Sequence, residues 1–231
     1  MKPANFKSPF DWNNRHITIH DKIWYLPKQF YDFDSFQFSG WSHPEVFEKQ
    51  QPICIEYCSG NGAWIAERAL KNPHFNWVAV EKKFVRARKI WTKLKSLNLT
   101  NLLIASAEGS LITQKYFPSN SVKSVYINFP DPWPKTRHAK HRIIQTPFIE
   151  DIWRILENNG DLTIVTDDPD YSEMVHKVLQ QSLGFQSLHP HPFYTVDYPD
   201  YGTSYFEDLW REKGKTIRYH VYRKVNGNDG S

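Results

Sequence analysis

The chain has 231 residues, of which 40% are apolar and 23% charged, and its formal net charge is +4. This composition suits one folded domain with or without an extension and excludes wholesale disorder. The mean hydropathy is −0.62, no apolar run approaches the ~18 residues of a membrane span, and residues 1–20 lack the apolar core of a secretory signal. We therefore expect a cytoplasmic protein, and its two cysteines, Cys54 and Cys58, exclude a disulfide framework.

Residues 1–50 form an aromatic and polar N-terminal extension without sustained periodicity. Such a segment either packs on the following domain or stays a mobile arm, and the sequence leaves both open. Residues 51–225 form the main domain, and residues 226–231 are expected to be a disordered tail. The large aromatic residues of the extension are Trp12, Trp24, Tyr25, Phe30, Tyr31, Phe33, Phe36, Phe38 and Trp41.

From residue 51 onward, short apolar runs alternate with amphipathic stretches. Apolar residues spaced by three and four predict helices over residues 84–97, 144–156 and 171–179, the second ended by Asn158-Asn159-Gly160. The apolar runs, which we expect to be strands, are Ile53–Tyr57, Trp77–Glu81, Leu102–Ala105, Val122–Ile127 and Leu162–Val165.

The end of the chain shows a different pattern, in which Ile217, Tyr219 and Val221 alternate with more polar residues. This alternation predicts a half-buried strand in antiparallel pairing. We therefore expect an α/β fold, with a mostly parallel sheet covered by helices on both faces and an antiparallel C-terminal strand.

A loop with two glycines, Gly60 and Gly62, follows the first strand and precedes a helix. By itself the loop also fits a plain turn, but Glu81 follows about 20 residues later, where an α/β nucleotide-binding unit places the acid that binds the ribose hydroxyls. The loop lacks a third glycine and a Gly-Lys-Ser/Thr motif, so a nucleoside without phosphates, such as S-adenosylmethionine, suits it best. Glu108, after the third strand, either lies near an adenine edge or is a solvated helix-start residue.

Prolines stiffen the loop Asn128–Lys135 directly after the fourth strand. The carboxyl end of a strand in an open α/β sheet faces the ligand crevice. Asp131, held between Pro130 and Pro132, offers a carboxylate to amide-like donors, and Trp133 offers a ring for stacking. We therefore favour a base-recognition site over a rigid structural turn.

Basic side chains follow this loop, with no acid between Asp131 and Glu150. A charge run is often only a solvated face, but this run adjoins the candidate site, which favours phosphate contacts. Its members are Lys135, Arg137, His138, Lys140, His141 and Arg142.

Two weaker candidates lie further along the chain. Asp167 follows the fifth strand and can face the crevice, whereas Asp168 is typical of a helix cap. The segment Thr203–Glu207 offers small polar groups and a carboxylate, and it also fits a helix N-terminus. The two cysteines lack partners at metal-ligand spacing, so we expect no metal.

Together these residues resemble the bacterial tRNA (guanine-N7)-methyltransferases, from about Pro52 to Lys224. The most specific feature is Pro-Asp-Pro-Trp-Pro-Lys-Thr-Arg-His-Ala-Lys, starting at Pro130. The resemblance implies a Rossmann-like class I methyltransferase fold, S-adenosyl-L-methionine as methyl donor, and the guanine at the conventional position 46 of the tRNA variable loop as substrate. It implies no obligate protein partner and leaves monomer or homodimer open.

The resemblance also implies site residues by matching position, with Asp131 as the catalytic residue. The methyl donor would contact Glu56, Gly60, Gly62, Glu81, Glu108 and Asp131. The substrate would contact Lys135, Asp167, Thr203, Ser204, Tyr205, Phe206 and Glu207, to which the basic run and the proline loop add Arg137, His138, Lys140, Arg142 and Trp133.

The sequence departs from the family pattern at three points. Cys58 stands where the family usually has the first glycine of its loop. Glu108 replaces the more usual aspartate. The segment Thr203–Glu207 is one residue longer than usual, so either Thr203 or Ser204 supplies the corresponding hydroxyl.

Guanine N7 has an exposed lone pair and carries no proton at neutral pH, so methylation needs alignment and stabilisation of the forming cation rather than a general base. A carboxylate that accepts hydrogen bonds from guanine N1–H and the N2 amino group serves that purpose. We expect Asp131 in this role, with Asp167 as a second acceptor.

Two alternatives remain. Enzymes that methylate adenine N6 or cytosine N4 carry an (Asn/Asp)-Pro-Pro-aromatic loop at the same strand end, which Phe129 and Asp131 interrupt here. A non-catalytic RNA-binding module on the same fold is disfavoured by the presence of both Glu81 and Asp131.

Overall fold

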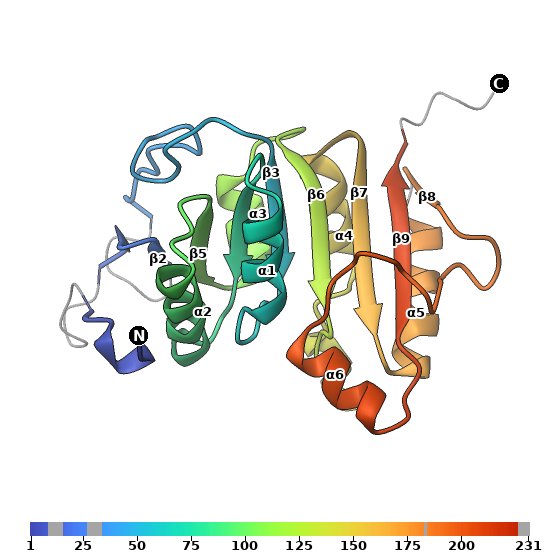
Figure 1. The fold of residues 1–231 in the computed structure, drawn as a ribbon. Helices are drawn as coiled ribbons and strands as arrows, with labels where there is room; N and C mark the ends of the chain where they lie inside the picture. The colour runs from blue at the N-terminus through green and yellow to red at the C-terminus, as the bar shows by residue number, and fades with distance from the viewer. Residues whose placement is uncertain (9–15, 27–33, 183, 226–231) are drawn as a thin grey trace. The chain divides into compact units, whose positions relative to one another are not determined.

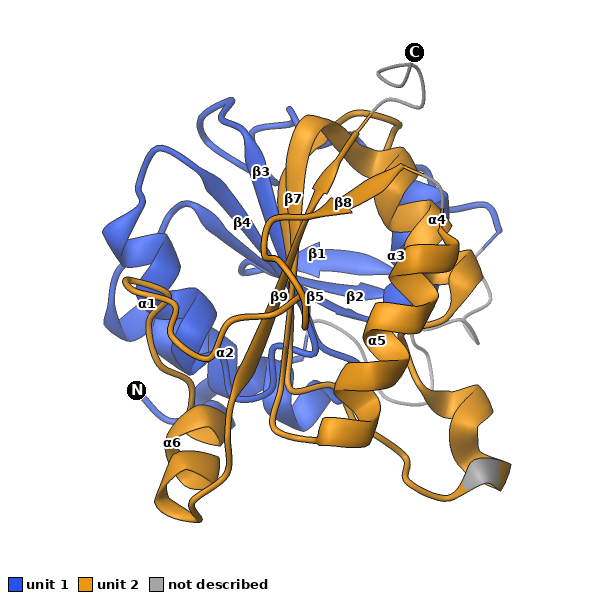
Figure 2. Ribbon diagram, turned by 90° about the vertical axis from the view of Figure 1, so that its right-hand side faces the viewer, with its two compact units in different colours: residues 1–116 blue, residues 117–231 orange. Residues whose placement is uncertain are grey.

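The computed structural model describes residues 1–8, 16–26, 34–182 and 184–225 (Figure 1). The expected disordered tail, 226–231, and the extension residues Trp12, Phe30, Tyr31 and Phe33 lie outside these ranges. The chain forms two compact units, Met1–Tyr116 and Phe117–Ser231 (Figure 2). The boundary between extension and main domain at residue 50 stays a prediction, and it does not coincide with the boundary between the two units at residue 116.

The sheet of the first unit has a parallel core. Its strands, in spatial order, are β1 (Thr18–His20), β2 (Ile23–Leu26), β5 (Leu102–Ala107), β4 (Asn76–Val80) and β3 (Ile53–Tyr57). All neighbours pair in parallel except β1 and β2. Every residue of β3, β4 and β5 is buried, as expected of near-continuous apolar strands covered on both faces.

Helices α1 (Ala63–Lys71) and α2 (Phe84–Ser96) cover one face of this sheet, and α3 (Gly109–Tyr116) covers the other (Figure 1). In α2 the buried residues are Ala87, Ile90, Trp91 and Leu94, which repeat at spacings of three and four as an apolar helix stripe does. α2 packs closely against the start of α1, whose N-cap is Gly62. A Cβ at Gly62 would lie only 2.7 Å from Cγ1 of Ile90 in α2, so this contact requires glycine.

The described part of the N-terminal extension packs within the first unit. After the short helix η1 (Pro3–Asn5), Phe6 lies edge-on to Trp91 with ring centroids 5.3 Å apart. Trp24, fully buried in β2, stacks on Phe38 at 4.4 Å and meets Tyr116 edge-on at 4.8 Å. The aromatic residues of the extension thus pack within the first unit on α2, through Trp91, and on α3, through Tyr116.

The second unit holds β6 (Val122–Asn128), β7 (Leu156–Thr166), β9 (Arg218–Lys224) and β8 (Phe185–Ser187) in this spatial order. β6 and β7 are parallel, whereas β9 is antiparallel to both β7 and β8. Helices α4 (Thr146–Ile155) and α5 (Pro169–Gln181) lie on one face (Figure 2). The helix α6 (Tyr205–Glu212) lies on the other side, beside the carboxyl ends of β6 and β7 (Figure 1).

Two local expectations were wrong. The predicted helix end Asn158-Asn159-Gly160 lies inside β7, since α4 ends at Ile155 and β7 begins at Leu156. Within this strand Asn159 takes a φ of 61°, and the register against β6 shifts between Val122 and Ser124. Such a register shift lets a strand carry extra residues. The C-terminal strand is buried on both faces rather than one, since His220 and Tyr222 lie under α5.

The expected fold class is confirmed: a mostly parallel α/β arrangement with an antiparallel C-terminal strand. No helix in the described part of the chain is long and apolar enough to cross a membrane.

Candidate functional site

The glycine loop between β3 and α1 has an unusual backbone. Cys58, Gly60 and Gly62 have φ values of 62°, 56° and 72°, in the region that glycine adopts at low cost. Cys58 therefore keeps a left-handed conformation at the position where the family usually has glycine. The hydroxyl of Ser59 donates to the carbonyl of Glu56 at 2.9 Å and helps to close the turn.

Glu81 connects this loop to the end of β4. Its Oε2 accepts a hydrogen bond from the backbone N–H of Gly60 at 2.9 Å, and its Oε1 accepts one from the N–H of Lys83 at 2.8 Å. Only 4% of the residue is exposed, and this burial raises the pKa of Glu81, although both hydrogen bonds and the charge of Arg86 oppose the shift. Glu81 is thus a structural anchor of the loop as well as a candidate ribose ligand.

The acids predicted to bind the methyl donor gather at one edge of the first unit's sheet. Glu56, Glu81 and Glu108 lie at or just beyond the carboxyl ends of the parallel neighbours β3, β4 and β5. Glu56 is buried, while Glu108 is exposed and its carbonyl accepts from the N–H of Ile112 at the start of α3.

The proline loop after β6 carries two aromatic residues with left-handed backbones, Phe129 at φ 48° and Trp133 at φ 42°. For bulky side chains this is a sparsely populated conformation, and such strain tends to gather at functional sites. The N–H of Phe129 donates to the carbonyl of Val165 at 2.9 Å, which fixes the start of the loop on β7. Asp131 is exposed, and its carboxylate has no hydrogen bond or ion pair within the described residues.

The basic run forms the short helix η2 (Thr136–His141) together with Lys135 before it and Arg142 after it. Lys135, Arg137 and Lys140 are exposed, whereas His138 and His141 flank the ring of Trp133, at centroid distances of 5.6 and 5.3 Å. The imidazoles thus contact the ring predicted to stack on a base.

Arg142 differs from the other basic residues of the run because its guanidinium donates hydrogen bonds to the backbone of the proline loop. Its Nε donates to the carbonyl of Pro132 at 2.8 Å, and its Nη2 donates to the carbonyl of Trp133 at 3.1 Å. Sequence reasoning missed this contact, because a backbone carbonyl has no residue-type signature.

Asp167 lies just after β7, as predicted, and is mostly buried with 12% of its side chain exposed. Its Oδ2 accepts a hydrogen bond from Nζ of Lys215 at 2.5 Å, and that ammonium lies 4.0 Å from the ring centroid of Trp210. Any substrate donor that reaches this carboxylate shares it with Lys215.

The segment Thr203–Glu207 starts α6. Ser204 is the N-cap, since its hydroxyl accepts from the N–H of Glu207 at 3.1 Å. The buried carboxylate of Glu207 accepts from the hydroxyl of Tyr219 at 2.6 Å and from Nε of Arg211 at 3.0 Å. Burial and the hydrogen bond to Glu207 raise the pKa of Tyr219.

Exposed groups of this segment are Thr203 and Tyr205, the latter 56% exposed, while Phe206 lies 6.4 Å from the ring centroid of Phe129. Tyr201, which the sequence did not single out, donates its hydroxyl to Oδ1 of Asn128 at 2.6 Å. These contacts bring the start of α6 to the proline loop within the second unit.

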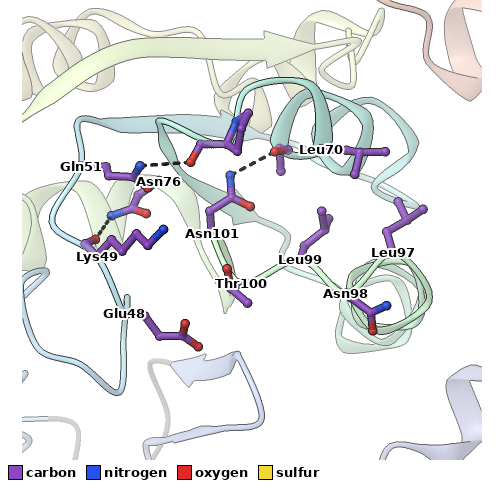
Figure 3. A pocket seen from close by; sticks show the side chains of 12 residues that line it. Glu48, Lys49, Gln51, Leu70, Asn76, Leu97, Asn98, Leu99, Thr100 and Asn101 are labelled. Carbon is purple, nitrogen blue, oxygen red and sulfur yellow. Dashed lines mark hydrogen bonds between the residues drawn. The ribbon is translucent and has the colours of Figure 1, made fainter.

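A cavity of about 210 Å³ in the first unit lies away from all of these residues (Figure 3). Its lining includes Asn76 and Asn101, at the amino ends of β4 and β5, and no predicted site residue. The amide of Asn101 donates to the carbonyls of Ala69 and Phe75, each at 3.0 Å. The cavity lies at the sheet edge opposite to the predicted donor site and is not the candidate site.

Solved structures of low sequence identity show the same fold. The 16S rRNA methyltransferase KamB has a TM-score of 0.59 at 12% identity, covering 83% of this chain and 96% of that one. A SAM-dependent methyltransferase from Aquifex aeolicus has a TM-score of 0.53 at 13% identity, covering 77% of this chain and 84% of that one. The fold is therefore that of the Rossmann-like methyltransferases, and a family described as putative methyltransferase matches residues 50–219.

Relatives with similar sequences identify the family, whereas the solved structures show only the fold. A tRNA (guanine-N(7)-)-methyltransferase of Chlamydia caviae is 40% identical over 98% of this chain and 100% of its own length. A protein of the same name from Chlamydia trachomatis is 41% identical over 94% of this chain and 95% of its own. The chain belongs to the tRNA (guanine-N7)-methyltransferase family.

Proposed function

We propose that this protein transfers a methyl group from S-adenosylmethionine to N7 of the guanine at position 46 in the variable loop of tRNA. The observation that carries the proposal is Asp131: an exposed carboxylate on a proline-stiffened loop, in a chain 40% identical to named tRNA (guanine-N7)-methyltransferases. A tRNA substrate agrees with a cytoplasmic location.

The residues of the first unit fit a nucleoside-containing donor. The positive φ values at Gly60 and Gly62 give the tight glycine turn that such a donor site uses. Glu81 offers lone pairs to ribose hydroxyls beyond those that accept from Gly60 and Lys83. Glu56 and Glu108 would contact the amino-acid and adenine ends. When bound, S-adenosylmethionine supplies an electrophilic methyl group on a sulfonium.

Methylation of N7 does not require the protein to transfer a proton. N7 attacks with a lone pair and has no proton to lose, so positioning and charge stabilisation carry the rate enhancement. Asp131 would accept from N1–H and the N2 amino group, which orients the base and stabilises the positive charge that forms on its ring. Asp167 would be a second acceptor, with Lys215 neutralising it before substrate arrives.

The exposed cations Lys135, Arg137 and Lys140 lie next to this loop in the sequence and would contact tRNA phosphates. Thr203 and Tyr205, exposed at the start of α6, would contact the nucleotide. Ser204 and Glu207 would act through the structure of α6, since both already form hydrogen bonds within the second unit.

A methyl-transfer assay tests the proposal. Purified protein, labelled S-adenosylmethionine and unmodified tRNA should give labelled tRNA in which mass spectrometry finds 7-methylguanine, and a tRNA with the variable-loop guanine replaced should stay unlabelled. N6-methyladenine or N4-methylcytosine would establish the amino-methylating alternative instead. Binding of tRNA without any transfer would establish the non-catalytic one.

A further inference from the structure

Arg142 is the one member of the basic run whose guanidinium is occupied by contacts within the described residues. Nε and Nη2 donate to the consecutive carbonyls of Pro132 and Trp133, and Nη1 lies 3.2 Å from the sulfur of Met174. Its Cζ lies 5.9 Å from the ring centroid of Tyr171. The guanidinium therefore connects the proline loop to α5.

The backbone of Arg142 is also held in place. Its N–H donates to the carbonyl of Ala139 at 3.0 Å, and its carbonyl accepts from Nε2 of Gln145 at 2.7 Å. The same amide of Gln145 donates to the carbonyl of Lys140 at 3.0 Å. A side chain anchored at both ends is suited to holding a neighbouring loop in one conformation.

The loop needs such support. Phe129 and Trp133 both have left-handed backbones, and residues in such regions persist only when their surroundings fix them, at a cost of order 1–3 kcal/mol each. The hydrogen bond from Phe129 to Val165 fixes the start of the loop. The two bonds from Arg142 fix its far side, directly after Asp131.

We propose that Arg142 is a positioning residue that holds the strained proline loop so that the Asp131 carboxylate meets the guanine, and that it is not a ligand of tRNA phosphate. The proposal rests on the proposed function. The planar guanidinium presents parallel N–H groups to two acceptors at once, whereas a lysine ammonium is a point charge. A phosphate contact tolerates lysine, but this contact does not.

Steady-state methyl-transfer assays and tRNA-binding titrations of Arg142→Lys and Arg142→Ala test this, with the exposed Lys177→Ala on α5 as matched control. Both Arg142 variants should lower kcat by about 10–100-fold, because a small misplacement of a reacting group costs rate of this order. The tRNA Kd and its salt slope should stay within about twofold of wild type, and millimolar guanidinium should partly restore kcat in Arg142→Ala. Wild-type kcat in Arg142→Lys, or a weakened Kd with a flatter salt slope, would overturn the proposal.

A second measurement needs no activity. Fluorine NMR of fluorotryptophan-labelled protein, with Trp133 assigned by Trp133→Phe, reports the loop directly. In Arg142→Ala the Trp133 resonance should move toward that of free fluorotryptophan, while the other resonances and the melting temperature change little. An unmoved resonance would overturn the positioning role. A wild-type protein that transfers no methyl group to tRNA would overturn only the proposed function, and the NMR result would still decide the contact.

Discussion

Glu81 uses both carboxylate oxygens on backbone N–H groups, from Gly60 at 2.9 Å and Lys83 at 2.8 Å. Glu81→Ala should lower the affinity for S-adenosylhomocysteine about 10–150-fold, since charge-assisted hydrogen bonds contribute roughly 1.5–3 kcal/mol. Part of that loss would come through the loosened loop. Calorimetry with the analogue that lacks both ribose hydroxyls separates the two effects.

If Glu81 binds the hydroxyls, the wild-type protein discriminates between the two ligands and Glu81→Ala binds them equally. Ser59→Ala, which removes a hydroxyl that closes the same turn at 2.9 Å, is the matched control and should keep the discrimination. Discrimination retained in Glu81→Ala would limit Glu81 to a structural role.

Asp131→Asn preserves the shape of the side chain and removes its charge. Because the carboxylate would stabilise a cation on the base, turnover should fall by on the order of 10²–10³, with a much smaller change in cofactor affinity. The exposed Asp170→Asn on α5 controls for the loss of one charge from the same unit.

The pH dependence separates this role from general base catalysis. Since N7 has no proton to lose, the single-turnover rate of the wild-type protein should be nearly flat from about pH 6 to 8. A tenfold rise per pH unit that disappears in Asp131→Asn would show that Asp131 takes a proton, and would favour attack by an amine.

Sequence and structure differ most where a side chain meets backbone or a distant residue. The spacing of Gly60, Gly62 and Glu81 follows from local turn chemistry, so it could be predicted. The contacts of Arg142 with two carbonyls could not be predicted, because a backbone carbonyl has no residue-type signature. The contact of Lys215 with Asp167 could not be predicted either, because the two residues are 48 positions apart. Cys58 replaces the glycine that the family usually has, and the sequence does not show whether the backbone there stays left-handed. The φ of 62° shows that it does.

At the scale of elements, η2 presents cations on its exposed side. Arg137→Ala and Lys140→Ala should each flatten the slope of log Kd for tRNA against log salt by up to about one unit, because each phosphate contact releases about one counterion. Their kcat at saturating tRNA should stay within a few-fold of wild type. Parental slopes in both variants would make η2 an ordinary solvated face.

The strands and helices predicted from apolar periodicity agree closely with those of the structure. The predicted strand Ile53–Tyr57 is β3, and the predicted helix over 84–97 is α2, Phe84–Ser96. The misses have tertiary causes. β2 was not predicted because its burial depends on distant partners, with Trp24 packing on Phe38 and Tyr116. β1, also not predicted, pairs with β2. β9 has no exposed face because α5 supplies Ser172 and His176 as partners for His220 and Tyr222.

At the scale of the whole molecule, buried titratable groups set the pH range of stability. His220 is fully buried in β9, and its Nε2 lies 2.8 Å from the hydroxyl of Ser172. Burial, together with the nearby His176, Arg218 and His189, lowers the pKa of His220 to about 4, although a hydrogen bond with the backbone of Phe193 opposes the shift. Burial also lowers the pKa of His176, whereas it raises that of Glu81, which partly offsets the two histidines on acidification.

The unfolded chain, with an ordinary histidine pKa of about 6.5, binds a proton at His220 before the folded chain does. Stability from neutral His220 is therefore complete above about pH 6.5 and is lost as the pH falls toward 4. Urea unfolding should show that the wild-type protein loses about 2 kcal/mol between pH 7 and 5 through this group. His220→Gln should lower stability at pH 7 but flatten the pH dependence, while the exposed His74→Gln should keep the wild-type slope. Equal slopes in wild type and His220→Gln would show that other groups govern acid unfolding.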